Sequence, residues 1–210
     1  MGDTKFERQR AAISMPIKIV RPNHFELLGE GYVLLTAPHA PGPEAEPYTG
    51  KIVEDAALTS RCYAVAGNVS PEYQDPNRIQ TARAELRSSV EAMLEENGIK
   101  CLLDVRGKKG AGVEIGMSDR TMVSSTTSEL VKARLSKRFT VARTPQSGGP
   151  QPQGALKLYS GRESGGERLF EALNLSFGQT EIELKRELVV NSLVELVALL
   201  NQELSKGEAK

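Results

Sequence analysis

The stretch YVLLTAPHAPGPEAEPYTGKIVEDAALTSRCYAVAG (residues 32–67) predicts a strand, a helix and a second strand in succession. The apolar runs 32–37 and 62–67 are typical of short buried strands. Between them, Thr49 can cap a helix that extends to about residue 61 and carries its apolar residues on one face. Two strands joined by a helix are the repeating unit of a layered α/β sheet.

The same alternation continues along most of the chain. Helices are expected over about 79–97, 126–138 (where Thr126 and Glu129 match a capping box) and 189–206, and strand segments over 99–105, 113–117, 139–143, 155–161, 173–178 and 180–188. The sequence therefore predicts a layered α/β sheet with helices packed on it. Residues 1–12 are expected to form a mobile tail and residues 13–210 a single domain.

Net charge and the lengths of the apolar segments indicate which binding partners and which cellular compartment to expect. The 210 residues include 27 basic and 27 acidic side chains, so the net charge is zero and gives no global case for binding nucleic acid or an anionic membrane. No apolar stretch approaches the ~20 residues of a membrane span, and the charged N-terminus lacks the apolar segment of a signal peptide. We therefore expect a cytoplasmic protein in which Cys62 and Cys101 are buried thiols. The sequence does not decide whether the protein forms a homo-oligomer.

Several polar residues follow apolar runs, where ligands bind in open α/β sheets. His39 comes after the first strand, close to Glu44 and Glu46. Imidazole with a nearby carboxylate could form half of a zinc site, although a histidine that hydrogen-bonds its own loop explains the same residues. The second histidine, His24, precedes the first clear strand, and we expect it to be exposed near a surface turn.

Two further segments carry candidate anion-binding residues. Asn77 and Arg78 belong to DPNR (residues 75–78), which predicts either a simple turn or a clamp for a substrate carboxylate. Arg106 begins the basic segment RGKKGAG (residues 106–112), which is expected to be a flexible loop that forms either an anion site or a solvated turn. This segment lacks the spacing of a phosphate-binding P-loop.

The segment TEIELKREL (residues 180–188) alternates as a strand with one polar face does. Glu181 and Glu183 would share that polar face. Glu183 is therefore a candidate general base that takes a proton from water, and Glu181 is its rival. A strand with one solvated face is the alternative interpretation.

Four patches together, TAPHAPGPEAEPYTG, DPNR, LLDVRGKKGAGVEIG and TEIELKREL, resemble the N-formylglutamate amidohydrolase-like family, which is related in fold to the zinc carboxypeptidases. Each motif is short, but their order is kept over about residues 32–204. The resemblance implies a phosphorylase/hydrolase-like, three-layer α/β fold with a mixed, largely parallel central sheet flanked by helices. It further implies a zinc ion and attack of water on an amide of a small N-acyl or γ-glutamyl amino-acid-like substrate.

The resemblance also implies roles for individual residues. It makes His39 the first zinc ligand, Glu44 the carboxylate ligand with Glu46 as the alternative, and Glu183 the general base. In the family, certain polar residues are expected to hold the carboxylate of the substrate. The residues at those positions in this sequence are Asn77, Arg78 and Arg186.

One departure from the family pattern concerns the metal. The second histidine ligand should stand at Arg106, and a guanidinium group cannot ligate zinc. Three interpretations follow. The protein could be an amidohydrolase in which a carboxylate such as Asp104 or Glu114 replaces the missing ligand, or in which a metal binds weakly. It could be a metal-free regulatory or carboxylate-binding protein in which Arg106 attracts the anion and pairs with Glu183. It could also be a subunit with an inert cleft.

Overall fold

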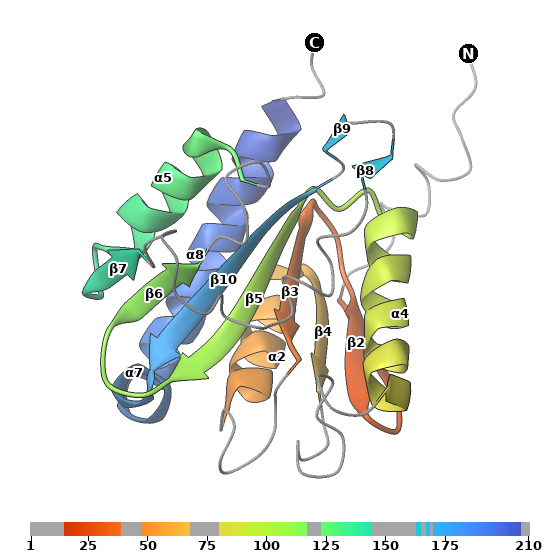
Figure 1. Ribbon diagram of the computed structural model, residues 1–210, viewed down its shortest axis with the longest axis horizontal. Coiled ribbons are helices and arrows are strands. Elements are labelled where there is room, and N and C mark those ends of the chain that lie inside the picture. Colours follow the sequence, from red (N-terminus) through yellow and green to blue (C-terminus); the bar gives the residue numbers. More distant parts are fainter. Residues whose placement is uncertain are drawn as a thin grey trace.

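The computed structural model describes residues 15–38, 48–67, 80–116, 123–143, 163–164, 167–168 and 170–206. The predicted fold class is confirmed, because a mixed eight-stranded sheet lies between two layers of helices (Figure 1). Its strands run in the order β1-β2-β4-β3-β5-β10-β6-β7. The expected tail (residues 1–12) and the expected strand at 155–161 lie outside the described residues.

The elements have the following bounds. The strands of the sheet are β1 (Ile17–Val20), β2 (His24–Leu28), β3 (Val33–Ala37), β4 (Tyr63–Gly67), β5 (Cys101–Lys108), β6 (Val113–Gly116), β7 (Val141–Arg143) and β10 (Glu171–Gly178). The helices are α2 (Thr49–Ser60), α4 (Gln80–Glu96), α5 (Ser125–Leu135), α7 (Gln179–Leu184) and α8 (Arg186–Ser205). A separate two-stranded ladder joins β8 (Glu163–Ser164) and β9 (Glu167–Arg168).

Four adjacent strands, β4, β3, β5 and β10, are parallel to one another. Their carboxyl ends therefore lie at one edge of the sheet, which is the lower edge in Figure 1. From β3 the chain passes through α2 to β4 on one side, and α4 then carries it back past β3 to β5. In sheets of this kind, ligands bind beyond the carboxyl ends of the strands, near such a change of direction.

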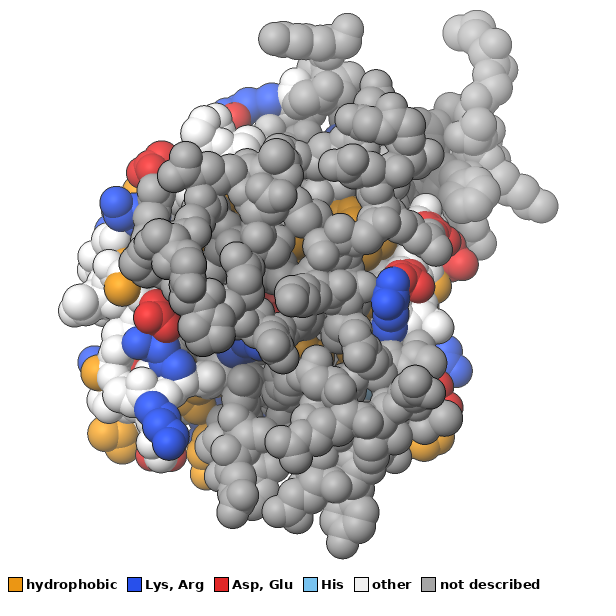
Figure 2. Space-filling view, viewed as in Figure 1, with side chains coloured by type: hydrophobic (Ala, Val, Ile, Leu, Met, Phe, Trp, Pro, Cys, Tyr) orange, Lys and Arg blue, Asp and Glu red, His pale blue; other side chains and the backbone are white. Residues whose placement is uncertain are grey.

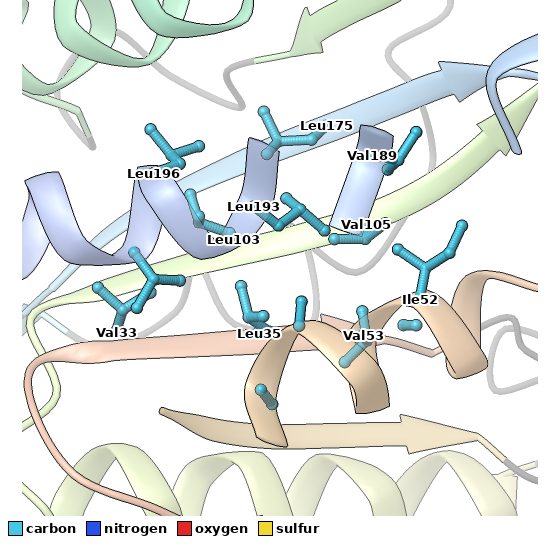
Figure 3. Close-up of a cluster of buried hydrophobic side chains, with 14 of the residues drawn as sticks. Val33, Leu35, Ile52, Val53, Leu103, Val105, Leu175, Val189, Leu193 and Leu196 are labelled. Atoms are coloured by element: carbon cyan, nitrogen blue, oxygen red, sulfur yellow. The ribbon is translucent and has the colours of Figure 1, made fainter. Parts of the chain in front are cut away.

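Apolar side chains of the sheet pack into two clusters, one on each face. The larger cluster lies between the sheet and α2, α5 and α8, and Figure 3 shows Leu35, Leu103 and Leu175 of the strands meeting Val53 and Leu193 of the helices. The smaller cluster lies under α4. Each fully buried side chain of this size contributes about 1.5–3 kcal/mol.

The closing helix α8 is long and apolar enough, by length and composition, to cross a membrane (20 residues, mean hydropathy 1.2 over its most apolar window). The expectation that no segment approaches this limit is therefore wrong for α8. However, Val189, Leu193, Leu196 and Leu200 are buried against the sheet. Packing in the core is a sufficient reason for the apolar character of this helix.

Three local predictions differ from the structure. Residues 180–188 form α7 and the start of α8 rather than a strand, because the chain turns directly out of β10 and buries Ile182 and Glu181 together. The strand β5 continues to Lys108, so Arg106 lies within a strand and not in a loop. Ser124, and not Thr126, caps α5, since its hydroxyl accepts a hydrogen bond from the backbone N–H of Thr127 at 3.1 Å.

His24 is the other correction, because it is buried in β2 with only 2% of its surface exposed. Its Nδ1 lies 2.5 Å from the side-chain oxygen of Asn23, and its Nε2 lies 2.9 Å from the hydroxyl of Ser89 in α4. Ser89 donates to Glu26 at 2.7 Å, and Arg21 also donates to Glu26. This polar cluster joins α4 to β2 beside the smaller apolar cluster.

The cluster makes stability depend on pH. Burial lowers the pKa of His24, so the unfolded chain binds the proton more readily than the folded chain. Burial alone would raise the pKa of Glu26, but hydrogen bonds from Arg21, Ser89 and His24 outweigh it and lower that pKa. Both contributions to stability are complete at neutral pH and are lost on acidification, first below about pH 6.5 for His24 and then below about pH 4.5 for Glu26.

Thermal unfolding should therefore show a lower Tm at pH 5.5 than at pH 7.5, and His24→Gln should flatten this difference. An unchanged pH dependence in the variant would contradict the assignment to His24.

Candidate functional site

A buried row of polar side chains crosses the sheet on the face that carries α4. Thr36 of β3, Asp104 of β5 and Asn174 of β10 are register partners, and each is at most 3% exposed. Side chains of successive strand residues point to opposite faces. Because the flanking residues of these strands belong to the larger apolar cluster, the polar row must face the other way.

Within this row, Asp104 holds Arg106. The Nε of Arg106 donates to Oδ2 of Asp104 at 2.7 Å, and the hydroxyl of Thr36 donates to Oδ1 at 3.0 Å. The Asp104 side chain is fully buried and that of Arg106 is 10% exposed. A buried pair of this kind contributes little net stability, but it fixes the position of the guanidinium group.

A second row lies one step nearer the carboxyl ends of β5 and β10. Ser176 is the register partner of Arg106 on one side and of Glu114 in β6 on the other. The residues flanking Glu114, Val113 and Ile115, belong to the larger apolar cluster, so Glu114 faces the same side as Arg106. We call Arg106, Ser176 and Glu114 the edge row. Figure 2 shows the molecule from this side, with described acidic and basic side chains visible around the margin of the face.

Glu183, the predicted base, does not belong to this face. It is exposed in α7, where its carboxylate accepts a hydrogen bond from Nε2 of Gln179 at 2.8 Å. With Arg186, it lines a surface pocket of about 430 Å³ that α2 and α8 enclose on the opposite layer. The guanidinium carbon of Arg186 lies 4.3 Å from the ring centre of Tyr48, which precedes α2. The structure thus places Glu183 near Arg186, and neither is an edge-row partner of Arg106.

Glu181, the rival of Glu183, is the buried glutamate of α7 (4% exposed). Its Oε2 accepts a hydrogen bond from the backbone N–H of Gly112 at 2.9 Å, and its Oε1 lies 3.5 Å from Nζ of Lys185. A side chain at Gly178 would lie 2.6 Å from the same Oε2 and from the carbonyl oxygen of Gly110. Glu181 therefore fastens the β5–β6 connection to the end of β10, which is a structural role.

The remaining predicted site residues, His39, Glu44, Glu46, Asn77 and Arg78, lie outside the described residues. The strands before them do fall at one edge, because β3 ends at Ala37 and β4 at Gly67, parallel to β5. Sequence reasoning missed Asn174 and Ser176 of β10. Their alternation with apolar residues in EALNLSFG was the available signal.

The described part of the chain does not fit a zinc ion as the resemblance places it. Among the described residues, no three His, Cys, Asp or Glu side chains form a group that could hold a metal. The position expected for the second histidine is Arg106, and its partner Asp104 is already engaged by two hydrogen bonds. The two cysteines are buried and free, as predicted, and burial raises the pKa of Cys62 to about 12 and also raises that of Cys101. Neither thiol is therefore a ready metal ligand.

Comparison with solved structures identifies the fold. The N-formylglutamate amidohydrolase from Ralstonia eutropha JMP134 superposes with a TM-score of 0.65 over 93% of this chain and 100% of that chain, at 13% identity. The chain has the fold of the N-formylglutamate amidohydrolases. A bacteriophage poly-gamma-glutamate hydrolase (TM-score 0.52, 12% identity, 90% and 92% covered) and a metallo-carboxypeptidase from Burkholderia cenocepacia (TM-score 0.51, 13% identity, 94% and 67% covered) share this amidohydrolase-like fold. No protein-family profile matches the chain, and no curated protein sequence matches it.

Proposed function

We propose that this protein uses an amidohydrolase-like fold to bind small carboxylate ligands without a metal, and that Arg106 is the anchor for the carboxylate. The observation that supports this function is the buried Arg106–Asp104 pair at 2.7 Å, in the strand where the resemblance expects a zinc ligand. A fixed guanidinium group supplies the positive charge that a zinc ion would otherwise supply, and it is the side chain best suited to bind a carboxylate.

The polar row supports this proposal in a second way. Asp104 accepts hydrogen bonds from both Thr36 and Arg106 and so holds the guanidinium group in place. Less side-chain entropy therefore remains to be lost when a ligand binds. On β10, the late strand beside β5, the polar side chains that face this side are those of Asn174 and Ser176, and neither carries a carboxylate that could act as a base. Recognition needs only donors and acceptors at these positions, whereas hydrolysis by activated water needs a base.

A zinc-dependent amidohydrolase is the second candidate, because the fold neighbours include an N-formylglutamate amidohydrolase and a metallo-carboxypeptidase. In that case His39 and Glu44 would hold the metal, Asn77, Arg78 and Arg186 would bind the substrate, and Glu183 would be the base. Glu114 would have to supply the missing ligand, since Asp104 is engaged. The substrates would be small N-acyl or γ-glutamyl amino acids.

Arg106→His separates the two candidates. We expect the natural protein to retain less than stoichiometric zinc after dialysis and metal analysis, and to hydrolyse neither N-formylglutamate nor a γ-glutamyl amino acid. Arg106→His removes the cation and adds a ligand beside Asp104, a carboxylate that can orient the imidazole. The variant should therefore gain zinc affinity, measurable by calorimetry, and lose carboxylate binding.

Arg106→Gln is the matched control, because it removes the cation without adding a ligand. It should lose carboxylate binding and gain no zinc. Stoichiometric zinc in the natural protein that disappears in His39→Ala would instead establish the hydrolase, and the binding function would have to be abandoned. A cytoplasmic location, a homo-oligomeric state and the absence of nucleic-acid and membrane partners remain predictions.

A further inference from the structure

The edge row carries two opposite charges separated by one hydroxyl group. Arg106 lies in β5, Ser176 in β10 and Glu114 in β6, and each is the register partner of the next. Neighbouring strands are about 4.8 Å apart, so the backbones at Arg106 and Glu114 are separated by roughly 9.6 Å. Side chains from both flanks can therefore reach a small molecule placed over Ser176.

The carboxylate of Glu114 is available to a ligand. It is half-buried, and no hydrogen bond or ion pair links its carboxylate to any other side chain in the described ranges. A carboxylate that is partly removed from water favours a cationic partner. The Nε of Arg106, by contrast, is held by Asp104 in the row behind.

We propose that the edge row binds an amino acid or amino-acid derivative with a free ammonium group, whose carboxylate pairs with Arg106 and whose ammonium pairs with Glu114. The hydroxyl of Ser176 lies between the two charges and faces the same side. This inference rests on the proposed carboxylate site at Arg106 and names the ligand class of that site.

The inference decides between the two ligand classes that the sequence leaves open. An N-acyl amino acid has no ammonium group, so it would leave the Glu114 carboxylate partly buried and without a cation, which costs binding energy. A γ-glutamyl compound keeps its free α-ammonium group and satisfies both ends of the row. The site should therefore prefer free and γ-glutamyl amino acids to N-acyl amino acids.

Calorimetry with three probes tests this inference on the full chain. L-Glutamate carries the ammonium group, N-acetyl-L-glutamate masks it, and glutarate lacks it without adding bulk. We expect L-glutamate to bind at least about tenfold more tightly than either of the other two, because one charge-assisted interaction of about 1.5–3 kcal/mol corresponds to tenfold or more.

Glu114→Gln should abolish this preference, since the substitution keeps the shape of the side chain and removes only the charge that the ammonium group would meet. Glu96→Gln, at an exposed glutamate near the end of α4, is the control that should retain the preference. If glutarate and L-glutamate bind equally well, and Arg106→Gln weakens both, the carboxylate site stands and the ammonium site is refuted. If none of the three probes binds, both proposals fail.

Discussion

Asp104→Ala is expected to lower the free energy of unfolding by about 3–5 kcal/mol, as removal of one partner of a buried ion pair does. The substitution leaves the Arg106 guanidinium in a site where its side chain is only 10% exposed, with its 2.7 Å partner gone. It also removes the acceptor of the Thr36 hydroxyl. Urea denaturation of the natural and substituted proteins measures the difference.

The double variant Asp104→Leu/Arg106→Met distinguishes an unpaired charge from a simple loss of packing. It replaces both charged partners by apolar groups of similar size, and such replacements are often neutral or stabilising by about 1–4 kcal/mol. Stability close to that of the natural protein would show that the cost in Asp104→Ala comes from the lost ion pair with the buried guanidinium group. Asp104→Ala with less than about 1 kcal/mol of destabilisation would mean that water reaches the pair, as it does at exposed ion pairs.

The central part of the fold was accessible from the sequence because strands and helices alternate there with clear periods. The apolar runs that became β3, β4 and β5 and the helices α2, α4 and α8 were each predicted within a few residues. The β1–β2 hairpin was missed, since HFELL is short and mixes charged and apolar residues. Its polar residues are satisfied by α4, a tertiary contact that no local pattern encodes.

The candidate site was harder to predict from the sequence than the fold, for a physical reason. Segment 180–188 alternates for only a few residues, and a short alternation does not distinguish a strand from a helical turn. Its misassignment directed attention to Glu183 and away from β10, whose Asn174 and Ser176 face the same side as Arg106. Arg106 could be singled out as the unusual residue from the sequence, because chemistry alone excludes a guanidinium ligand for zinc. What the sequence could not supply was the partner, since Asp104 becomes relevant only when β5 extends past it.

Phe177→Ala is expected to destabilise the fold by about 3–5 kcal/mol, the range for deleting a buried aromatic side chain. Phe177 is fully buried in β10, and its ring meets that of Phe139 edge to face, with 5.7 Å between centroids and an angle of 79° between planes. The substitution leaves a cavity between the sheet and the helices behind it. Phe177→Leu, which refills part of that volume, should cost clearly less in the same denaturation experiment.

The preceding residue in β10 gives the matched comparison, because Ser176 and Phe177 point to opposite faces of one strand. The hydroxyl of Ser176 donates a hydrogen bond to Asn174 at 3.0 Å, so Ser176→Ala should lower the free energy of unfolding by only about 0.5–1.5 kcal/mol while it weakens glutamate binding at the edge row. Phe177→Leu should do the reverse and keep the affinity of the folded protein. If both variants lose affinity and stability together, the two faces of β10 are not independent, and binding at the edge row would depend on the packing of the core rather than on the three polar side chains themselves.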